Sequence, residues 1–301
     1  MPHLALTLEL TGLLDPAVAE EACFDAGAVA VTLTDAADDA ILEPRPGEER
    51  HWPRTVLEAL FDAEDATPAL LADVARRLGV EPGRIAVRAV GDRAWEREWL
   101  KDFHAMRFGR RLWIVPHHEP LPTEPDAVVV RLDPGLAFGT GTHPSTALCL
   151  EWLDTGLVPG STVIDYGCGS GVLAIAAAKL GAASVLGYDL DPQAGIATRD
   201  NAAANGVLDR VTVADVPETL PGNANLLLAN IISGTLCELA PSFAQMLQPG
   251  TTLVLAGILE EQADEVIATY SHWFRLEPWQ RRGGWVALAG NRCSPPAPTA
   301  R

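Results

Sequence analysis

The sequence predicts an α/β protein: a doubly wound parallel sheet with one antiparallel edge strand, preceded by a small α+β domain of the ferredoxin-like type. Two patterns lead to this prediction. From residue 162 onward, short apolar runs alternate with helical patterns, which is typical of repeated βα units. The first 90 residues instead follow the order strand, helix, strand, strand, helix, strand, which is typical of a ferredoxin-like domain.

The first domain is predicted over residues 1–90. Alternating apolar and polar positions indicate its first strand, and Asp15 stands where the first helix needs an N-cap. Pro68 suits the first turn of the second helix, which Gly79 ends. The expected strands are Leu4–Leu10, Ala28–Leu33, Thr55–Phe61 and Ile85–Val90, and the expected helices are Asp15–Ala26 and Thr67–Leu78.

Residues 91–108 are predicted to form a linker helix between the domains. Aromatic side chains alternate there with basic ones, a pattern that would also suit contact with RNA. Packing of the aromatic side chains at a domain junction is the commoner explanation, and we favour it. The aromatic residues are Trp95, Trp99, Phe103 and Phe108, and the basic ones are Arg93, Arg97, Lys101, His104 and Arg107.

Residues 109–290 are predicted to form the second domain, and the Pro- and Ala-rich residues 291–301 a disordered tail. Strands Leu112–Val115 and Ala127–Leu132 lead into this domain. Two final strands without a helix between them predict the antiparallel edge. The expected strands are 162–166, 184–189, 210–214, 225–230, 251–258, 274–279 and 285–289. One helix is expected to begin near Pro144, and four more are expected at 172–180, 192–205, 234–247 and 260–271.

A glycine-rich turn follows the strand 162–166. Gly167, Gly169 and Gly171 remove the Cβ atoms from one side of this turn, so that a ligand can rest against bare backbone and the N-terminus of the next helix. The following strand ends in Asp189, where a carboxylate can accept both hydroxyls of a ribose. Since acids stand at the ends of both strands, Asp165 in the first and Asp189 after the second, a nucleoside site is favoured over a turn that binds no ligand.

The glycine spacing distinguishes two kinds of nucleotide-like ligand. A dinucleotide site has the spacing G-x-G-x-x-G, because its helix N-terminus must receive a pyrophosphate. Here the spacing is G-x-G-x-G, preceded by Asp165. A carboxylate would repel a diphosphate and would attract the ammonium group of a methionine moiety. The turn therefore suits S-adenosylmethionine better than NAD.

Further polar residues are predicted to gather at the same end of the sheet. The segment Asp133–Thr146 combines four hydroxyls, glycines and a histidine before a helix, a composition that suits a ligand-binding loop. His143 is expected to cap or brace this loop rather than to act as a general base. The strand ends carry Asp165, Asp189, Asp215 and Asn230, where ligands of such sheets bind.

Composition limits the function classes. The formal charge of −18 and the pI of about 4.7 argue against general affinity for nucleic acid and favour a basic partner, although acidity also serves solubility. The five cysteines are scattered, so neither a zinc site nor a disulfide framework is expected, and no metal is predicted. The absence of a signal-like or membrane-spanning apolar run predicts a cytoplasmic protein.

With these residues in view, the sequence resembles the class I S-adenosylmethionine-dependent methyltransferases, which have a Rossmann-like sheet. More narrowly, it is similar to the PrmA family, which methylates the eleventh protein of the large ribosomal subunit. The resemblance covers roughly residues 90–290 and, more weakly, the first domain, and the loop sequence FGTGTH is its most specific part. The matching segments are Asp133–Thr146, Val163–Gly181, Asp189–Gly206, Leu228–Ile232 and, in the linker, Trp95–Pro116.

The resemblance implies a ferredoxin-like domain that recognises the ribosomal protein and a second domain that trimethylates lysine side chains and the α-amino group. It implies that Thr146, Gly167, Asp189 and Asn230 bind the cofactor, and that Phe138, Gly139 and Thr140 line the site. Asp165 and Gly169 of the turn and Gly139 of the loop join the expected cofactor-binding residues, and Asn230, Phe138 and Thr140 are the expected catalytic residues. Ser233 departs from the family, which more often has a small apolar residue there.

Other functions remain alternatives. The closest is a methyltransferase of the same fold that acts on RNA or on a small-molecule amine, but the separate first domain and the acidic surface favour a protein substrate. The fourth motif, Leu228–Ile232, lacks the Asn-Pro-Pro-Tyr of glutamine and nucleobase amino-methyltransferases. An NAD-dependent oxidoreductase lacks support in the glycine spacing. A non-catalytic binding module would not need the complete FGTGTH loop. No general base is expected, since an amine that is desolvated in the site loses its proton more readily.

Overall fold

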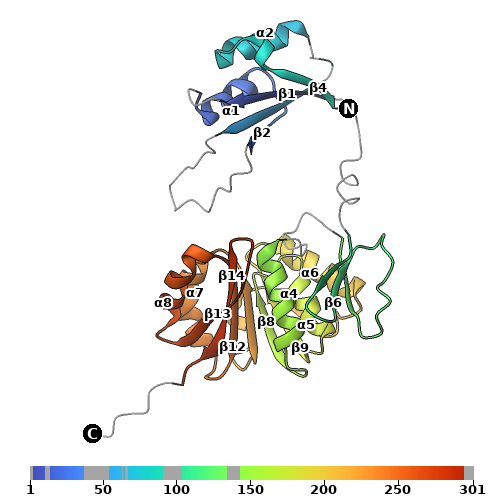
Figure 1. Ribbon diagram of the computed structural model, residues 1–301, viewed down its shortest axis with the longest axis vertical. Helices are drawn as coiled ribbons and strands as arrows, with labels where there is room; N and C mark the ends of the chain where they lie inside the picture. Colours follow the sequence, from blue (N-terminus) through green and yellow to red (C-terminus); the bar gives the residue numbers. More distant parts are fainter. Residues whose placement is uncertain are drawn as a thin grey trace, which may run out of the picture. The chain divides into compact units, whose positions relative to one another are not determined.

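The computed structural model describes residues 3–10, 14–36, 54–62, 64, 67–90, 104–133 and 143–294. The chain forms two compact units, Met1–Arg97 and Glu98–Arg301. Figure 1 shows their helices and strands in the order in which the chain builds them. No helix among the described residues is both long enough and apolar enough to cross a membrane.

The first unit has a four-stranded sheet with the order β2-β3-β1-β4, in which every neighbouring pair is antiparallel. This is the strand order of a ferredoxin-like sheet. The helices bury one face of it, with Leu6, Leu57, Phe61 and Val74 in the core. Its elements are β1 (His3–Leu10), α1 (Pro16–Asp25), β2 (Ala30–Asp35), β3 (Thr55–Asp62), α2 (Pro68–Leu78), the 3-10 turn η2 (Pro82–Arg84) and β4 (Ala86–Val90).

Local signals set the helix ends of this unit. The Asp15 carboxylate accepts a hydrogen bond from Ala17 N at 2.9 Å, and the Thr67 hydroxyl accepts one from Leu70 N at 3.2 Å. Gly79 ends α2 with φ +65°, a left-handed conformation that glycine adopts without strain. The caps predicted from sequence are therefore confirmed.

The second unit contains a seven-stranded sheet with the order β10-β9-β8-β11-β12-β14-β13. The first five strands in this order are parallel, and β14 pairs antiparallel with both of its neighbours. The strands are β8 (Thr162–Tyr166), β9 (Ser184–Tyr188), β10 (Val211–Ala214), β11 (Leu226–Asn230), β12 (Thr252–Leu259), β13 (Phe274–Arg282) and β14 (Trp285–Arg292).

The predicted antiparallel edge strand is misplaced by one position. Gly283 and Gly284, both with positive φ, join β13 and β14 in a tight hairpin. Within this hairpin β14 pairs with β12, which leaves β13 at the edge. The antiparallel strand is therefore the one next to the edge, and the sequence pattern could not show it because both strands of a hairpin look alike.

Helices cover both faces of this sheet, as the doubly wound prediction requires (Figure 1). One buried cluster contains residues of α4, α5 and α6, and the other contains residues of α7 and α8. The helices are α4 (Pro144–Gly156), α5 (Val172–Lys179), α6 (Pro192–Ala204), α7 (Ser233–Met246) and α8 (Ala263–Tyr270), with 3-10 turns η4 (Pro217–Thr219) and η5 (Glu260–Gln262).

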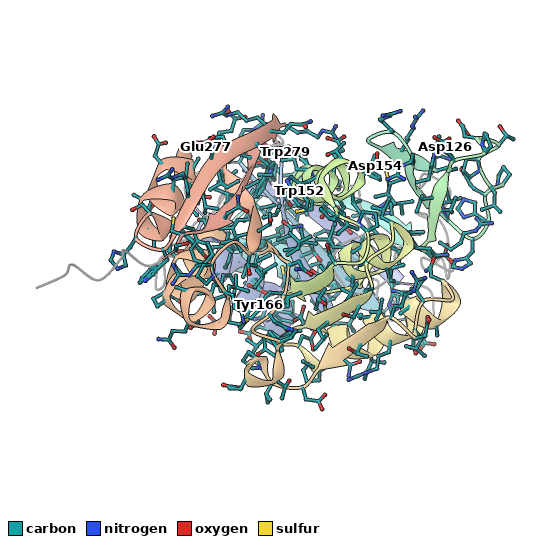
Figure 2. The ribbon with its side chains drawn as sticks, turned by 90° about the horizontal axis from the view of Figure 1, so that it is seen from below. Asp126, Trp152, Asp154, Tyr166, Glu277 and Trp279 are labelled. Atoms are coloured by element: carbon teal, nitrogen blue, oxygen red, sulfur yellow. The ribbon has the colours of Figure 1, made fainter. Side chains whose placement is uncertain are left out.

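The C-terminal end of the predicted linker helix is wrong, because Met106–Phe108 belong to a second sheet of three strands. This sheet has the order β5-β6-β7, formed by β5 (Met106–Phe108), β6 (Leu112–Val115) and β7 (Val128–Arg131). Met106–Phe108 is a strand because Gly109, at φ +66°, turns the chain back to pair it with β6. Asp154 of α4, labelled in Figure 2, fixes this turn by accepting hydrogen bonds from Arg110 N and Arg111 N. Residues 91–103 of the predicted linker lie outside the described residues.

The predicted tail begins too early. Asn291 and Arg292 belong to β14, where Arg292 N donates to Thr251 O at 2.9 Å and Arg292 O accepts from Gly250 N at 2.9 Å. Backbone pairing with the neighbouring strand thus extends the sheet past residue 290. Residues 295–301 lie outside the described part of the chain.

Candidate functional site

The candidate site lies where the parallel strands end. β8, β9, β10 and β11 are consecutive neighbours in parallel register, so that their carboxyl ends meet at one edge of the sheet. Asp165, Asp189, Asp215 and Asn230 stand at or just after these ends. The structure therefore brings together the four strand-end residues that the sequence singled out.

The glycine turn needs its glycines for two separate reasons. Gly167, Gly169 and Gly171 all have positive φ, between +53° and +81°. In addition, a Cβ atom on Gly167 would lie 2.5 Å from Cγ2 of Ile231, and one on Gly171 would lie 2.9 Å from the Thr198 side chain. The turn before α5 is therefore packed tightly against Ile231 and Thr198, and side chains at Gly167 or Gly171 would not fit.

Asp189 is fastened to this turn. Its Oδ2 accepts a hydrogen bond from Gly169 N at 2.8 Å, and its Oδ1 accepts one from Asp191 N at 3.0 Å. A carboxylate has about four acceptor positions, so that two remain for donors of a ligand. The carboxylate is half-buried at the end of β9 and is thus held in place to accept two hydroxyl groups.

Asp165 lies beneath the turn. It is fully buried, its Oδ2 accepts a hydrogen bond from Ala174 N at 3.0 Å, and its Oδ1 has no hydrogen-bond partner among the described residues. Burial raises the pKa of this carboxyl group to about 7, and the Asp189 charge adds to the shift. Asp165 therefore caps the first turn of α5, and its unpartnered oxygen favours a cationic group close to the turn.

The raised pKa of Asp165 predicts a pH-dependent stability. Between about pH 4 and 7 the folded chain binds a proton that the unfolded chain has lost, so its free energy of unfolding falls as the pH rises. Asp165→Asn removes this dependence. In urea unfolding without ligand, the free energy of unfolding of the variant, relative to that of the wild type, should rise by about 2 kcal/mol as the pH is raised from about 5 to 8. An Asp215→Asn variant, whose carboxylate is exposed, is the control; equal pH profiles of wild type and Asp165→Asn would contradict the prediction.

Asn230 and Thr146 form the other side of the site. Asn230 Nδ2 donates a hydrogen bond to the Thr146 hydroxyl at 3.1 Å, and Thr146 is almost fully buried in α4. This bond fixes the amide, so its carbonyl oxygen Oδ1 is available as an acceptor at the end of β11. His143 is the N-cap of α4, with its Nδ1 accepting from Ser145 N at 3.3 Å, as expected for a bracing residue.

Two exposed apolar residues directly follow strand-end acids, and the sequence analysis did not name them. Leu190 directly follows Asp189 and is 89% exposed, and Val216 directly follows Asp215 and is 46% exposed. They follow the neighbouring strands β9 and β10, at the edge of the sheet where the acids stand. The signal that could have identified them is a large apolar residue immediately after an acid at a strand end.

The described part of the site contains no metal centre and no free thiol poised to react. Among the described residues, no group of three or more His, Cys, Asp or Glu side chains could hold a metal ion. Burial raises the pKa of the Cys168 thiol to about 12, which keeps it protonated. Phe138, Gly139 and Thr140 lie outside the described residues. The described groups together suit a ligand that contains a nucleoside and a cationic group. Asn230 adds an acceptor oxygen for a hydrogen-bond donor beside this ligand.

Comparison with known proteins is consistent with this geometry. A family model described as ribosomal protein L11 methyltransferase (PrmA) matches residues 8–293. A ribosomal protein L11 methyltransferase of Pseudomonas aeruginosa (strain LESB58) is 49% identical over 296 residues, with 97% of this chain and 99% of the relative covered. One of Vibrio cholerae serotype O1 is 47% identical with the same coverage. A crystal structure of a ribosomal protein L11 methylase of Lactobacillus delbrueckii subsp. bulgaricus matches at 34% identity with a TM-score of 0.59, covering 64% of this chain and 100% of that chain.

Proposed function

This chain belongs to the ribosomal protein L11 methyltransferase (PrmA) family, and we propose that it trimethylates lysine side chains and the N-terminal amino group of ribosomal protein L11 with S-adenosylmethionine as the methyl donor. The match of the family model over residues 8–293 carries the proposal, because it spans both the site and most of the first unit. We place the reaction in the cytoplasm, where ribosomal proteins are made.

The described residues fit S-adenosylmethionine. The turn places Gly167, Gly169 and Gly171 just before α5, where backbone without a Cβ atom suits a closely bound ligand, and Asp189 has acceptor positions for the two ribose hydroxyls. Leu190 and Val216 offer apolar walls for the adenine ring, and the unpartnered Oδ1 of Asp165 favours the ammonium group. When bound, the sulfonium cofactor supplies an already activated methyl group.

The chain's own task is then to align the acceptor amine and keep it neutral. A free lysine, with a pKa of about 10.4, is almost wholly protonated at neutral pH, so desolvation in the site must lower its pKa. We propose that the carbonyl oxygen of Asn230 accepts a hydrogen bond from the amine and orients its lone pair, and the bond that fixes the amide to Thr146 supports this role. Phe138 and Thr140 are proposed to complete this positioning.

Charge supports a role of the first unit in recognising a basic protein. Met1–Arg97 holds 19 of the 40 acidic residues and 9 of the 22 basic ones, a net charge of −10 on about a third of the chain. The larger unit, Glu98–Arg301, carries a net charge of −8. Such a surface attracts a basic protein and repels a phosphate backbone. We therefore propose recognition of the ribosomal protein without direct contact with nucleic acid.

A transfer assay tests the proposal. The purified chain is incubated with methyl-labelled S-adenosylmethionine and, in parallel, with unmethylated large-subunit proteins, with ribosomal RNA and with a mixture of small-molecule amines. Label on L11 alone is the expected result. Label on RNA or on a small amine would move the substrate to the alternative class while leaving the cofactor assignment in place.

A further inference from the structure

One side of helix α6 and its C-cap residue carry a stripe of three polar side chains that point into the molecule: Thr198, Asn201 and the C-cap Asn205. These residues are three and four positions apart and therefore lie along one side of the helix. Thr198 is fully buried and Asn205 is 7% exposed. Each of the three bonds to backbone of another element, although no role in the reaction has been assigned to them so far.

The first two residues of the stripe hold the cofactor turn from below. The Thr198 hydroxyl donates to Gly169 O at 3.1 Å, and Asn201 Nδ2 donates to Ser170 O at 2.8 Å. Two consecutive peptide carbonyls of the turn are thereby drawn towards α6. The Gly171 N–H, which belongs to the same peptide unit as the Ser170 carbonyl, donates to Cys168 O at 2.8 Å, so both polar groups of this peptide unit are fixed and the turn is held in one shape.

Asn205 holds a different wall. Its Oδ1 accepts from Arg131 N at 2.7 Å, and its Nδ2 donates to Arg131 O at 2.7 Å. The side-chain amide thus pairs with the edge of β7 as another strand would, since β6 is the only neighbour of β7 among the described strands. Nδ2 also donates to Asn201 O at 2.9 Å, which ties this contact to the helix turn that holds Ser170.

Strand β7 has a special place in the chain. It ends at Arg131, and two residues later Asp133 is anchored by His117, whose backbone N–H donates to Asp133 Oδ1 at 2.7 Å. The chain then continues directly into the segment with Phe138 and Thr140. The polar stripe therefore connects the cofactor turn with the strand after which the chain continues into Phe138 and Thr140, the residues proposed above to position the acceptor.

On the basis of the function proposed above, we propose that Asn201 and Asn205 are positioning residues, which set the cofactor turn and strand β7 at a fixed separation for methyl transfer. Neither residue is expected to touch a reacting atom. Asn201 acts through the Ser170 carbonyl and so on the cofactor, whereas Asn205 acts through the Arg131 backbone and so on the acceptor. A residue with a merely structural role would not divide its effects in this way.

The test uses variants of the full chain that keep side-chain shape and remove the amide donor. Asn201→Asp should weaken S-adenosylmethionine binding, measured by calorimetry, by about tenfold, because the Ser170 carbonyl then faces a carboxylate. Asn205→Asp should leave this affinity within about twofold and lower kcat/KM for L11 by about tenfold. Asn223→Asp, which makes the same charge change at an exposed position, is the matched control and should change neither value.

Circular dichroism at the assay temperature first establishes that each variant is folded, and Asn201→Ala and Asn205→Ala replace any variant that is not. Wild-type affinity in both Asn201 variants, or parallel losses of affinity and turnover at the two positions, would overturn the proposed division of roles. If the wild type itself bound no S-adenosylmethionine, the proposed function would fail, and the positioning roles would fail with it. If the wild type binds S-adenosylmethionine and methylates L11 but the variants do not differ as predicted, only the positioning roles fail.

Discussion

Replacing Asn230 with alanine is expected to lower kcat for methylation of L11 by about 100-fold, because a misdirected nucleophile loses the in-line approach to the methyl group. The structure gives the reason for this size. Asn230 is the last residue of β11, and its amide is held by the hydrogen bond to the buried Thr146 hydroxyl. The fixed amide is rigid enough to orient an amine, which a water molecule in its place would not be.

Two variants complete this experiment, which measures single-turnover rates with saturating S-adenosylmethionine. Thr146→Val keeps the shape of the side chain but removes the oxygen that accepts from Asn230, so a smaller loss of about tenfold is expected. Asn223→Ala, at the opposite end of the strands, should behave as the wild type. Unchanged turnover and unchanged cofactor affinity in Asn230→Ala would rule out the orienting role.

Replacing Asp189 with alanine is expected to weaken S-adenosylmethionine binding by at least about 100-fold. Two hydrogen bonds from ribose hydroxyls to a carboxylate are lost, each of which contributes about 1.5–3 kcal/mol. The substitution also leaves Gly169 N without its acceptor at 2.8 Å, which loosens the turn itself. Calorimetric titration of the purified variant measures the dissociation constant directly.

Asp191 is the matched control for this prediction. It lies two residues further on, carries the same charge, and caps α6 by accepting from Gln193 N at 2.9 Å. Asp191→Ala should cost about 1 kcal/mol of unfolding free energy and leave the dissociation constant within about twofold. An equal loss of affinity in both variants would mean that net charge, rather than the ribose contact, governs binding.

The parts of the fold that the sequence predicted well are those decided locally. Helix ends followed from caps such as Thr67 and Gly79, and the glycine turn followed from its spacing before an Ala-rich helix. These features depend on residues within a few positions of one another. The alternation of apolar runs and helical patterns predicted a parallel sheet, and in such a sheet the acids that follow the strands lie at one edge.

The features that the sequence did not predict depend on contacts between distant residues. Met106–Phe108 was assigned to a helix because its pairing with β6 depends on a turn at Gly109 that Asp154, 45 residues away, supports. The insertion of β14 between β12 and β13 is likewise a matter of pairing, as is the contact between Asn205 and Arg131. The burial of Asp165 could not be read from its position in the motif, since its depth depends on packing against α5.

Mass spectrometry of L11 after exhaustive reaction with the purified chain tests the central claim most directly. The proposed function predicts that L11 gains methyl groups in threes, and that fragmentation places them on lysine side-chain nitrogens and on the N-terminal amino group. The Asn230→Ala chain should give mainly unmodified L11 under the same conditions. Two results would contradict the proposed reaction: an unchanged mass of L11 although the wild-type chain binds S-adenosylmethionine, or methyl groups on atoms other than amine nitrogens.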